Sequence, residues 1–220
     1  MNDGDPGAKP RLTAGVVALV VLASAGAGVA AALAIHSAAT GPAHPGAAAR
    51  HGLRGDALWA RNRKPAPAFT LRDQHSRLVS LSEQRGRPVV LAFMDSHCKA
   101  ICKLEGPMLG RILARAGREA SLVVVSVNPW QDTPASTRAA AAHWRLGSGW
   151  LWLRGSPARL RPIWNAYGIK VKRTQGDVSH STAIYLIDRS GHERAGFNFP
   201  FAADDVLHDL RLLSAGDGRT

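Results

Sequence analysis

The sequence has only two cysteines among its 220 residues, and it contains no zinc-finger spacing, no RNP motif and no internal repeat. A structural zinc site requires four protein ligands, so two cysteines argue against one. The missing motifs, and the lack of a basic helix with interleaved aromatic residues, argue against nucleic-acid binding. What two cysteines can do therefore becomes the main question about function.

Acidic residues are scarce: 16 Asp and Glu stand against 28 Lys and Arg, which gives a formal net charge of +12. Such a charge is typical of proteins that bind nucleic acid or an anionic membrane surface. The arginines are spread along a chain that is also rich in Ala, Gly and Pro, and no single basic patch stands out. We therefore expect no nucleic-acid partner. The length suits one domain with a full hydrophobic core and some extra sequence at an end.

Charged residues are absent from Leu12 to Ile35, a run of 24 residues. A helix of that length spans a bilayer, whereas the apolar part of a cleaved signal peptide is shorter, so we favour an uncleaved transmembrane anchor over residues 12–35. Lys9 and Arg11 keep residues 1–11 in the cytoplasm by the positive-inside rule. This predicts a single-pass cell-membrane protein whose C-terminal domain is extracytoplasmic, where two thiols meet an oxidising environment.

Residues 36–64 are polar, rich in Ala, Gly and Pro, and without a sustained apolar period, so they are interpreted as a flexible linker to a folded domain over residues 65–220. The domain alternates apolar runs of strand length with helical patterns, which predicts an α/β fold with a parallel sheet segment and an antiparallel edge. The expected strands are 68–73, 78–84, 88–94, 121–127, 150–155, 181–188 and 193–199, and the expected helices are 102–117, 133–146, 156–168 and 203–213. Asp132 or Thr133 is available to cap the second helix, and capping is the preferred role for Asp132.

Both cysteines, Cys98 and Cys102, follow the expected strand 88–94 directly, at the carboxyl end where open α/β sheets place their chemistry. If the next helix has started by Cys98, their spacing of four puts both sulfurs on one face. The helix N-terminus and the neighbouring Lys99 and Lys103 favour thiolates, the form that attacks disulfides and binds soft metals. A purely structural disulfide is the alternative, although so short a loop gives little stabilisation.

Several segments together resemble the Sco/SenC family of membrane-anchored proteins of cytochrome oxidase assembly: PAFTLRDQHSRLVSL, RGRPVVLAFMDSHCKAIC, VVVSVNPWQDTPAS, LRPIWNAYGI and VSHSTAIYLIDRSG. The resemblance covers about Pro65 to the end. It implies a thioredoxin-like fold and a copper site made by Cys98, Cys102 and His180. The chain departs from the family pattern in two places: Lys99 and Lys103 occur where proline is common, and Asn128 where an aspartate is usual.

Two thiolates and one imidazole form a soft, three-coordinate set that suits Cu(I) and leaves the ion open to a partner's ligands. His97 could replace His180 in principle, but beside Cys98 it is better interpreted as a supporting or surface group. The first hypothesis is therefore a copper metallochaperone, not an enzyme in the strict sense, that serves a cytochrome c oxidase subunit. The alternative is a thiol-disulfide oxidoreductase, which needs Cys98 and Cys102 as a redox-active pair but not His180. A peroxidase is less favoured, because no threonine stands three residues before Cys98.

Overall fold

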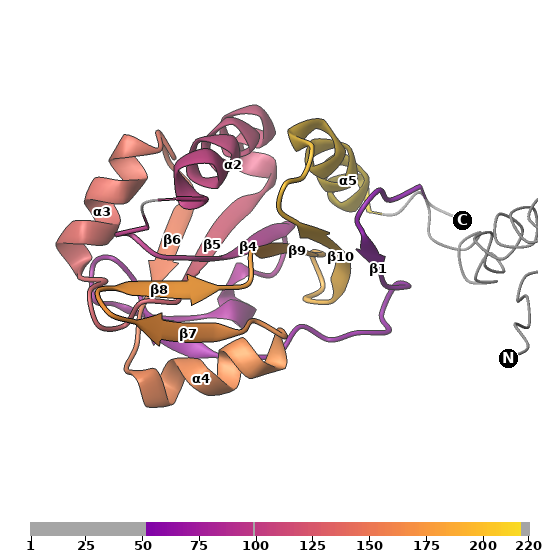
Figure 1. The fold of residues 1–220 in the computed structure, drawn as a ribbon. Helices are drawn as coiled ribbons and strands as arrows, with labels where there is room; N and C mark the ends of the chain where they lie inside the picture. The colour runs from indigo at the N-terminus through magenta and orange to yellow at the C-terminus, as the bar shows by residue number, and fades with distance from the viewer. Residues whose placement is uncertain (1–51, 99, 217–220) are drawn as a thin grey trace, which may run out of the picture. The chain divides into compact units, whose positions relative to one another are not determined.

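Apolar runs form the middle of a six-stranded mixed sheet (Figure 1). The computed structural model describes residues 52–98 and 100–216. The strand order is β1-β10-β9-β4-β5-β6, in which β4, β5 and β6 run parallel and the remaining neighbours antiparallel. The strands are β1 (Ala57–Leu58), β4 (Val89–Met94), β5 (Ser121–Ser126), β6 (Trp150–Leu153), β9 (Ala183–Ile187) and β10 (Glu193–Asn198). Every residue of β4 and β5 is buried, as expected of central strands covered on both faces.

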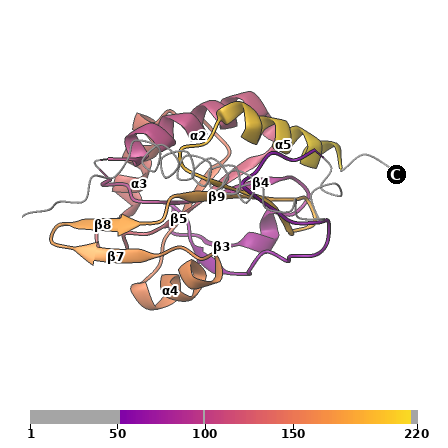
Figure 2. The ribbon, with the colours of Figure 1, turned by 45° about the vertical axis from the view of Figure 1, so that its right-hand side comes forward.

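Other elements cover both faces of this sheet (Figure 2), and each face packs into its own hydrophobic core. Alternate residues of β4 point to opposite faces, so Val90 and Ala92 join one core and Leu91 and Phe93 the other. The first core is closed by α2 (Cys102–Ala116), α3 (Pro134–His143) and α5 (Ala203–Ala215). The second is closed by α4 (Pro157–Ala166) and by the hairpin of β2 (Thr70–Arg72) and β3 (Leu78–Ser80). The predicted α/β architecture, including its antiparallel edge, is confirmed.

Short helical turns and caps complete these elements. The 3-10 turns η1 (Leu81–Gln84) and η2 (Gly117–Glu119) follow β3 and α2. Thr133 caps α3 and forms a reciprocal capping box with Ser136. The preferred role for Asp132 as the cap is therefore wrong, because its carboxylate is buried and accepts hydrogen bonds from other residues.

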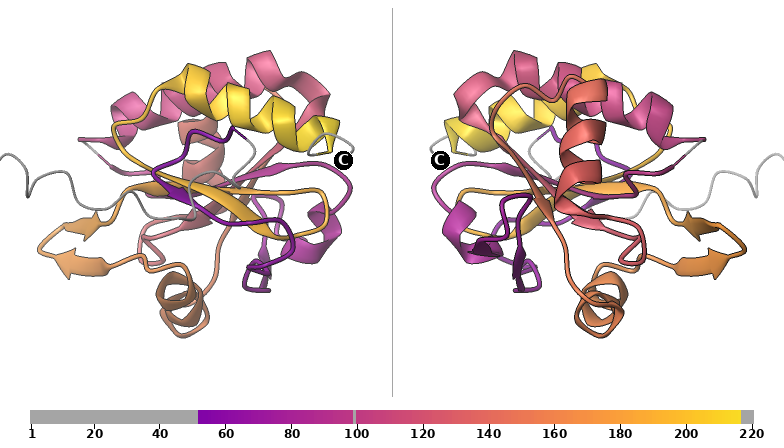
Figure 3. Two further views of the ribbon diagram at one scale, coloured as in Figure 1. Left: turned by 90° about the vertical axis from the view of Figure 1, so that its right-hand side faces the viewer. Right: turned by 90° about the vertical axis from the view of Figure 1, so that its left-hand side faces the viewer.

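A second hairpin, not predicted from the sequence, is formed by β7 (Val171–Thr174) and β8 (Asp177–His180). Its residues are polar and mostly exposed, so the sequence shows no apolar alternation that would predict these strands. Figure 3 shows it projecting from the end of the domain at which α2 begins. His180, the predicted ligand, is the last residue of β8.

The segment from Gly52 to Lys64, which its composition places in a linker, lies along the domain. The backbone N–H of Arg54 donates to Asp209 Oδ1 of α5 at 2.9 Å, and β1 pairs with β10. Lys64 forms an ion pair of 2.8 Å with the buried Glu193. A two-residue strand is too short to leave a periodic pattern, and this is why the boundary predicted at Pro65 came late.

Among the described residues, no helix combines the length and apolar character needed to cross a membrane. The anchor predicted over residues 12–35, the N-terminus 1–11 and the linker up to residue 51 lie outside the described residues.

Candidate functional site

The loop between β4 and α2 carries both cysteines. Cys98 lies in this loop and α2 begins only at Cys102, so the condition that the helix has started by Cys98 is not met. The two residues nevertheless interact, because the backbone N–H of Cys102 donates to Cys98 Sγ at 3.3 Å. Both thiols are free, with Cys98 half-buried and Cys102 fully buried. The Cys98 sulfur thus accepts a hydrogen bond from the first backbone N–H of α2.

The two cysteines differ sharply in acidity. The Cys102 thiol donates to the Cys98 sulfur, and together with backbone N–H groups of Cys102 and Ala100 it lowers the pKa of Cys98 to about 6. The same hydrogen bond and burial raise the pKa of Cys102. The prediction that both thiols are activated is therefore wrong for Cys102. Hydrogen bonding accounts for the lowered pKa of Cys98, against the opposing effect of burial.

Two buried polar side chains, Asp132 and Asn128, hold the cysteine loop through hydrogen bonds. Asp132 Oδ1 accepts from the backbone N–H of Ser96 at 3.0 Å and from the Ser96 hydroxyl, and its Oδ2 accepts from Ser126. Asn128 donates its amide to Asp95 Oδ1 at 3.1 Å. The Asn128 that departs from the family pattern is thus paired with a carboxylate one strand away. Asp132, predicted as a cap, instead holds the cysteine loop in place.

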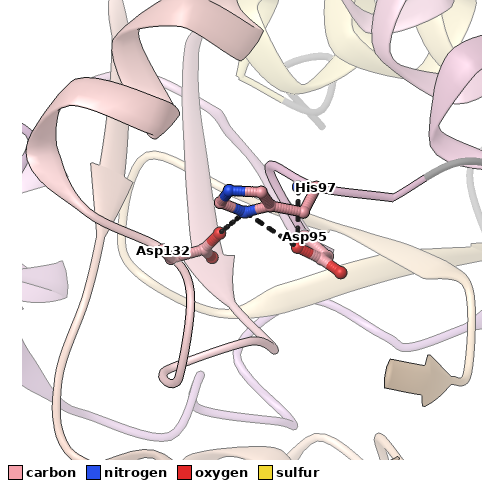
Figure 4. A group of neighbouring side chains, drawn as sticks. All are labelled: Asp95, His97 and Asp132. Carbon is pink, nitrogen blue, oxygen red and sulfur yellow. Dashed lines mark hydrogen bonds and ion pairs between the residues drawn. The ribbon is translucent and has the colours of Figure 1, made fainter. Parts of the chain in front are cut away.

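The His97 ring points from this loop toward the carboxylates of Asp95 and Asp132 (Figure 4). Its Nδ1 is 3.9 Å from both Asp95 Oδ1 and Asp132 Oδ1, and its side chain is exposed. These are the three described residues whose possible ligand atoms all lie within 4.8 Å of one another. The oxygens nearest His97 already accept hydrogen bonds, Asp95 Oδ1 from the His97 backbone N–H at 2.8 Å and Asp132 Oδ1 from Ser96. This arrangement is consistent with His97 as a surface group.

His180 precedes β9, which places it near the end of the sheet where β4 leads into the cysteine loop. Ala92 of β4 pairs with Ile184 of β9, so the residues that precede β9 lie beside those that follow β4. His180 Nδ1 is 2.9 Å from the carbonyl of Ser181. A carbonyl can only accept, so Nδ1 carries the proton and Nε2 is left to bind a ligand. Burial lowers the pKa of His180 and favours the neutral imidazole.

The structure places Cys98, Cys102 and His180 at one edge of the sheet without closing them into a metal-binding triangle. Their ligand atoms do not all lie within 4.8 Å of one another, since among the described residues only the group around His97 meets that spacing. The Asp95 carboxylate acts electrostatically on both Cys98 and His180. Its Oδ2 atom is buried and has no hydrogen-bond partner among the described residues.

Glu105 is a further component of the candidate site, and the sequence did not predict it. It is fully buried, and neither carboxylate oxygen has a partner among the described residues. Burial, with a smaller contribution from the Cys98 thiolate, raises its pKa to about 8. The available signal was spacing: Cys102, Glu105, Leu109 and Ile112 form one buried stripe of α2. A glutamate three residues after a buried cysteine lies on the helix face that turns toward the core.

The mixed sheet and the CxxxC pair at the junction of a central strand and the next helix define a thioredoxin-like thiol protein. The chain belongs to the SCO1/SenC family, whose sequence profile matches residues 60–214. A relative from Stutzerimonas stutzeri, named for copper binding, is 26% identical over 153 residues, which cover 66% of this chain and 74% of that protein.

Solved structures agree with this assignment. ScoI from Bradyrhizobium japonicum, solved with copper bound, is 25% identical with a TM-score of 0.58, and the match covers 68% of this chain and 99% of that one. Apo Sco1 from Thermus thermophilus is 25% identical with a TM-score of 0.63, over 75% of this chain and 99% of that one. The predicted family is confirmed, and with it the thioredoxin-like fold of the described residues.

Proposed function

We propose that this protein is a membrane-anchored, extracytoplasmic copper metallochaperone that binds Cu(I) through Cys98, Cys102 and His180. The observation that carries the proposal is the meeting, at one edge of the sheet, of an acidic thiol, a second thiol hydrogen-bonded to it and an imidazole with a free Nε2. Thiolates and imidazole are the ligands that a soft cuprous ion prefers.

The protonation states support this ligand set. Cys98, with a pKa of about 6, is largely a thiolate at neutral pH, and the lowered pKa of His180 keeps the imidazole neutral. Only Cys102 must lose a proton as the ion arrives. The copper bound to the Bradyrhizobium japonicum relative, which shares the fold and 25% of the residues, supports copper as the cargo.

The receiving protein in this proposal is a cytochrome c oxidase subunit, the role that the family resemblance implies. The apolar residues 12–35 would anchor the chain in the cell membrane, with residues 36–51 as a tether and the domain on the extracytoplasmic side. A site with three protein ligands leaves room for the client's own ligands to approach the ion, so the ion can be passed on.

Replacing His180 with alanine tests the proposed ligand set. We expect the Cu(I) affinity of His180→Ala, measured by competition with a chromogenic chelator, to fall at least about tenfold, because one of three ligands is lost. His143→Ala is the control, since His143 is exposed at the end of α3. An unchanged affinity in His180→Ala would show that the assignment of His180 is wrong.

A thiol-disulfide oxidoreductase is the second candidate, favoured by the difference in acidity between the two cysteines. The Cys98 thiolate would attack a client disulfide and form a mixed disulfide, and Cys102 would then attack Cys98. The client leaves with two thiols, and the protein keeps the Cys98–Cys102 disulfide. In this case His180→Ala retains stoichiometric reduction of a disulfide substrate, while Cys98→Ser abolishes it.

A further inference from the structure

Large apolar side chains are exposed at four places in the described part of the chain, and three of them lie on or next to the cysteine loop. Ile101 is 41% exposed, Leu104 64% and Trp130 39%. The fourth, Leu78, lies on the β2–β3 hairpin and is 56% exposed. Single exposed apolar residues are ordinary, but a group of them beside a reactive site marks a surface that another molecule covers.

Ile101 directly precedes α2, and Leu104 lies on the first turn of that helix. The backbone N–H of Leu104 donates to the carbonyl of Ile101 at 2.9 Å, so the two residues belong to one helical turn. The same turn buries Cys102 and Glu105 on its inner side. A partner that contacts Ile101 and Leu104 would therefore meet the outer face of the turn whose inner face carries Cys102.

Trp130 extends this surface toward the histidine. Its loop is tied to the cysteine loop by the hydrogen bonds from Asn128 to Asp95 and from Ser96 to Asp132. The Arg173 guanidinium of β7 lies 4.9 Å from the centre of the Trp130 ring. Trp130 thus stands between the loop of Cys98 and the hairpin that ends at His180.

The charges around these residues are mainly positive. Lys103, Lys172 and Arg173 are exposed, and none forms an ion pair with another described residue. Asp177, at the start of β8, is the exposed acid of this hairpin. An apolar centre with a cationic border is complementary to a surface that presents an apolar side chain among carboxylates.

We propose that Ile101, Leu104 and Trp130 form a docking surface for the copper-receiving domain of the client. The neighbouring Lys103, Lys172 and Arg173 would contact carboxylates of that domain. The inference rests on the proposed function and adds the chemistry of the partner. The client would present an apolar side chain, bordered by acidic residues, next to its own copper site before that site is filled. Docking there brings the client's ligands to the open side of Cys98 and His180.

The test measures copper transfer from the full chain in lipid nanodiscs to the copper-free soluble domain of a cytochrome c oxidase subunit. We expect Leu104→Ser and Trp130→Ala each to raise the half-saturating concentration of that domain by about tenfold, while Cu(I) affinity stays within about twofold of wild type. Leu78→Ser is the matched control and should transfer like wild type. Raising NaCl to about 0.5 M should also weaken transfer, because it screens the cationic border.

Each other outcome is decisive. Equal half-saturation in Leu104→Ser, Trp130→Ala and Leu78→Ser overturns the docking surface, and so does a failure of the wild-type chain to bind the oxidase domain at all. A wild-type dimer that Leu104→Ser converts to a monomer assigns the surface to a second copy and also overturns it. If the wild-type chain does not bind Cu(I), the proposed function is refuted. Docking can still be tested in that case, by titrating the copper-free chain with the oxidase domain.

Discussion

The two halves of the site are held in very different ways. The cysteine loop follows a fully buried central strand and rests on the hydrogen bonds of Asp95, Asn128 and Asp132. The histidine ends a two-stranded hairpin that, in the described part of the chain, pairs only with itself. Its base is held by bonds between Lys170 and Ser181, and its side by the contact of Arg173 with Trp130.

This difference separates the part of the site that contributes to the stability of the fold from the part that can move without unfolding it. A loop supported by buried polar groups cannot change without cost to the fold, whereas an exposed hairpin with few buried contacts can shift at little cost. This agrees with the spacing of the proposed ligands Cys98, Cys102 and His180, whose ligand atoms do not all lie within 4.8 Å of one another. We expect changes in the buried groups that support the cysteine loop to alter stability and thiol chemistry, and changes in the hairpin to alter copper affinity with little effect on stability.

The largest effect is expected from Asp132→Ala. It removes the acceptor for the Ser96 backbone N–H and for the hydroxyls of Ser96 and Ser126, and it should lower the free energy of unfolding by about 4 kcal/mol. Urea denaturation measures this. Asp177→Ala in the hairpin is the control, with an expected loss below about 0.5 kcal/mol because Asp177 is exposed. Equal losses in the two variants would contradict the division into two halves.

Glu105→Gln should show that the cysteine half also contains an unfavourable group. The pKa of Glu105 rises from 4.5 to about 8 on folding, so the folded state keeps a proton that the unfolded chain releases, and stability falls as pH rises through this window. The glutamine side chain of the variant cannot ionise. The stability of Glu105→Gln relative to wild type should therefore increase by about 3 kcal/mol between about pH 5 and pH 7.5.

Thermal or urea unfolding at several pH values measures this difference. Glu119→Gln, at an exposed glutamate after the same helix, is the control and should follow the wild-type pH dependence. Parallel curves for Glu105→Gln and wild type would show that Glu105 is ionised in the folded protein.

Cys102→Ala should change the chemistry of Cys98. Removing the Cys102 thiol removes the first of the hydrogen bonds that stabilise the Cys98 thiolate, and the pKa of Cys98 should rise from about 6 to above about 7. The pH dependence of Cys98 alkylation in the copper-free chain reports this pKa. His180→Ala should leave the profile unchanged, because the histidine half does not contribute to it. A midpoint that stays at about 6 in Cys102→Ala would overturn the assigned cause.

The sequence predicted the cysteine half better than the histidine half. Strands β4 and β5, helix α2 and the cysteine pair follow from continuous apolar runs and helical spacing, which are the strongest local signals. The polar strands β7 and β8 carry neither signal, so the element that ends at His180 was missed. His180 itself came from the resemblance to the family.

The sequence also did not predict which carboxylates are buried. Glu105 and Asp132 look like surface residues in a sequence, since carboxylates are seldom fully buried. Only the fold shows that Asp132 accepts the hydrogen bonds of the cysteine loop and that Glu105 faces inward without a partner among the described residues. The difference in acidity between Cys98 and Cys102 likewise depends on a hydrogen bond that spacing alone does not specify.

The smallest effect, and the sharpest test of the histidine half, comes from the turn of its hairpin. Gly176 joins β7 to β8 with a φ of +75°, and a Cβ there would meet no atom within 4 Å, so Gly176→Ala adds backbone strain of about 1 kcal/mol without a clash. Cu(I) affinity should fall about fivefold with an almost unchanged melting temperature. Gly117→Ala places the same strain, at a φ of +58°, at the end of α2, and should lower the melting temperature and leave copper affinity intact. If both variants lose stability and keep copper affinity, the hairpin is as firmly part of the folding unit as the cysteine loop.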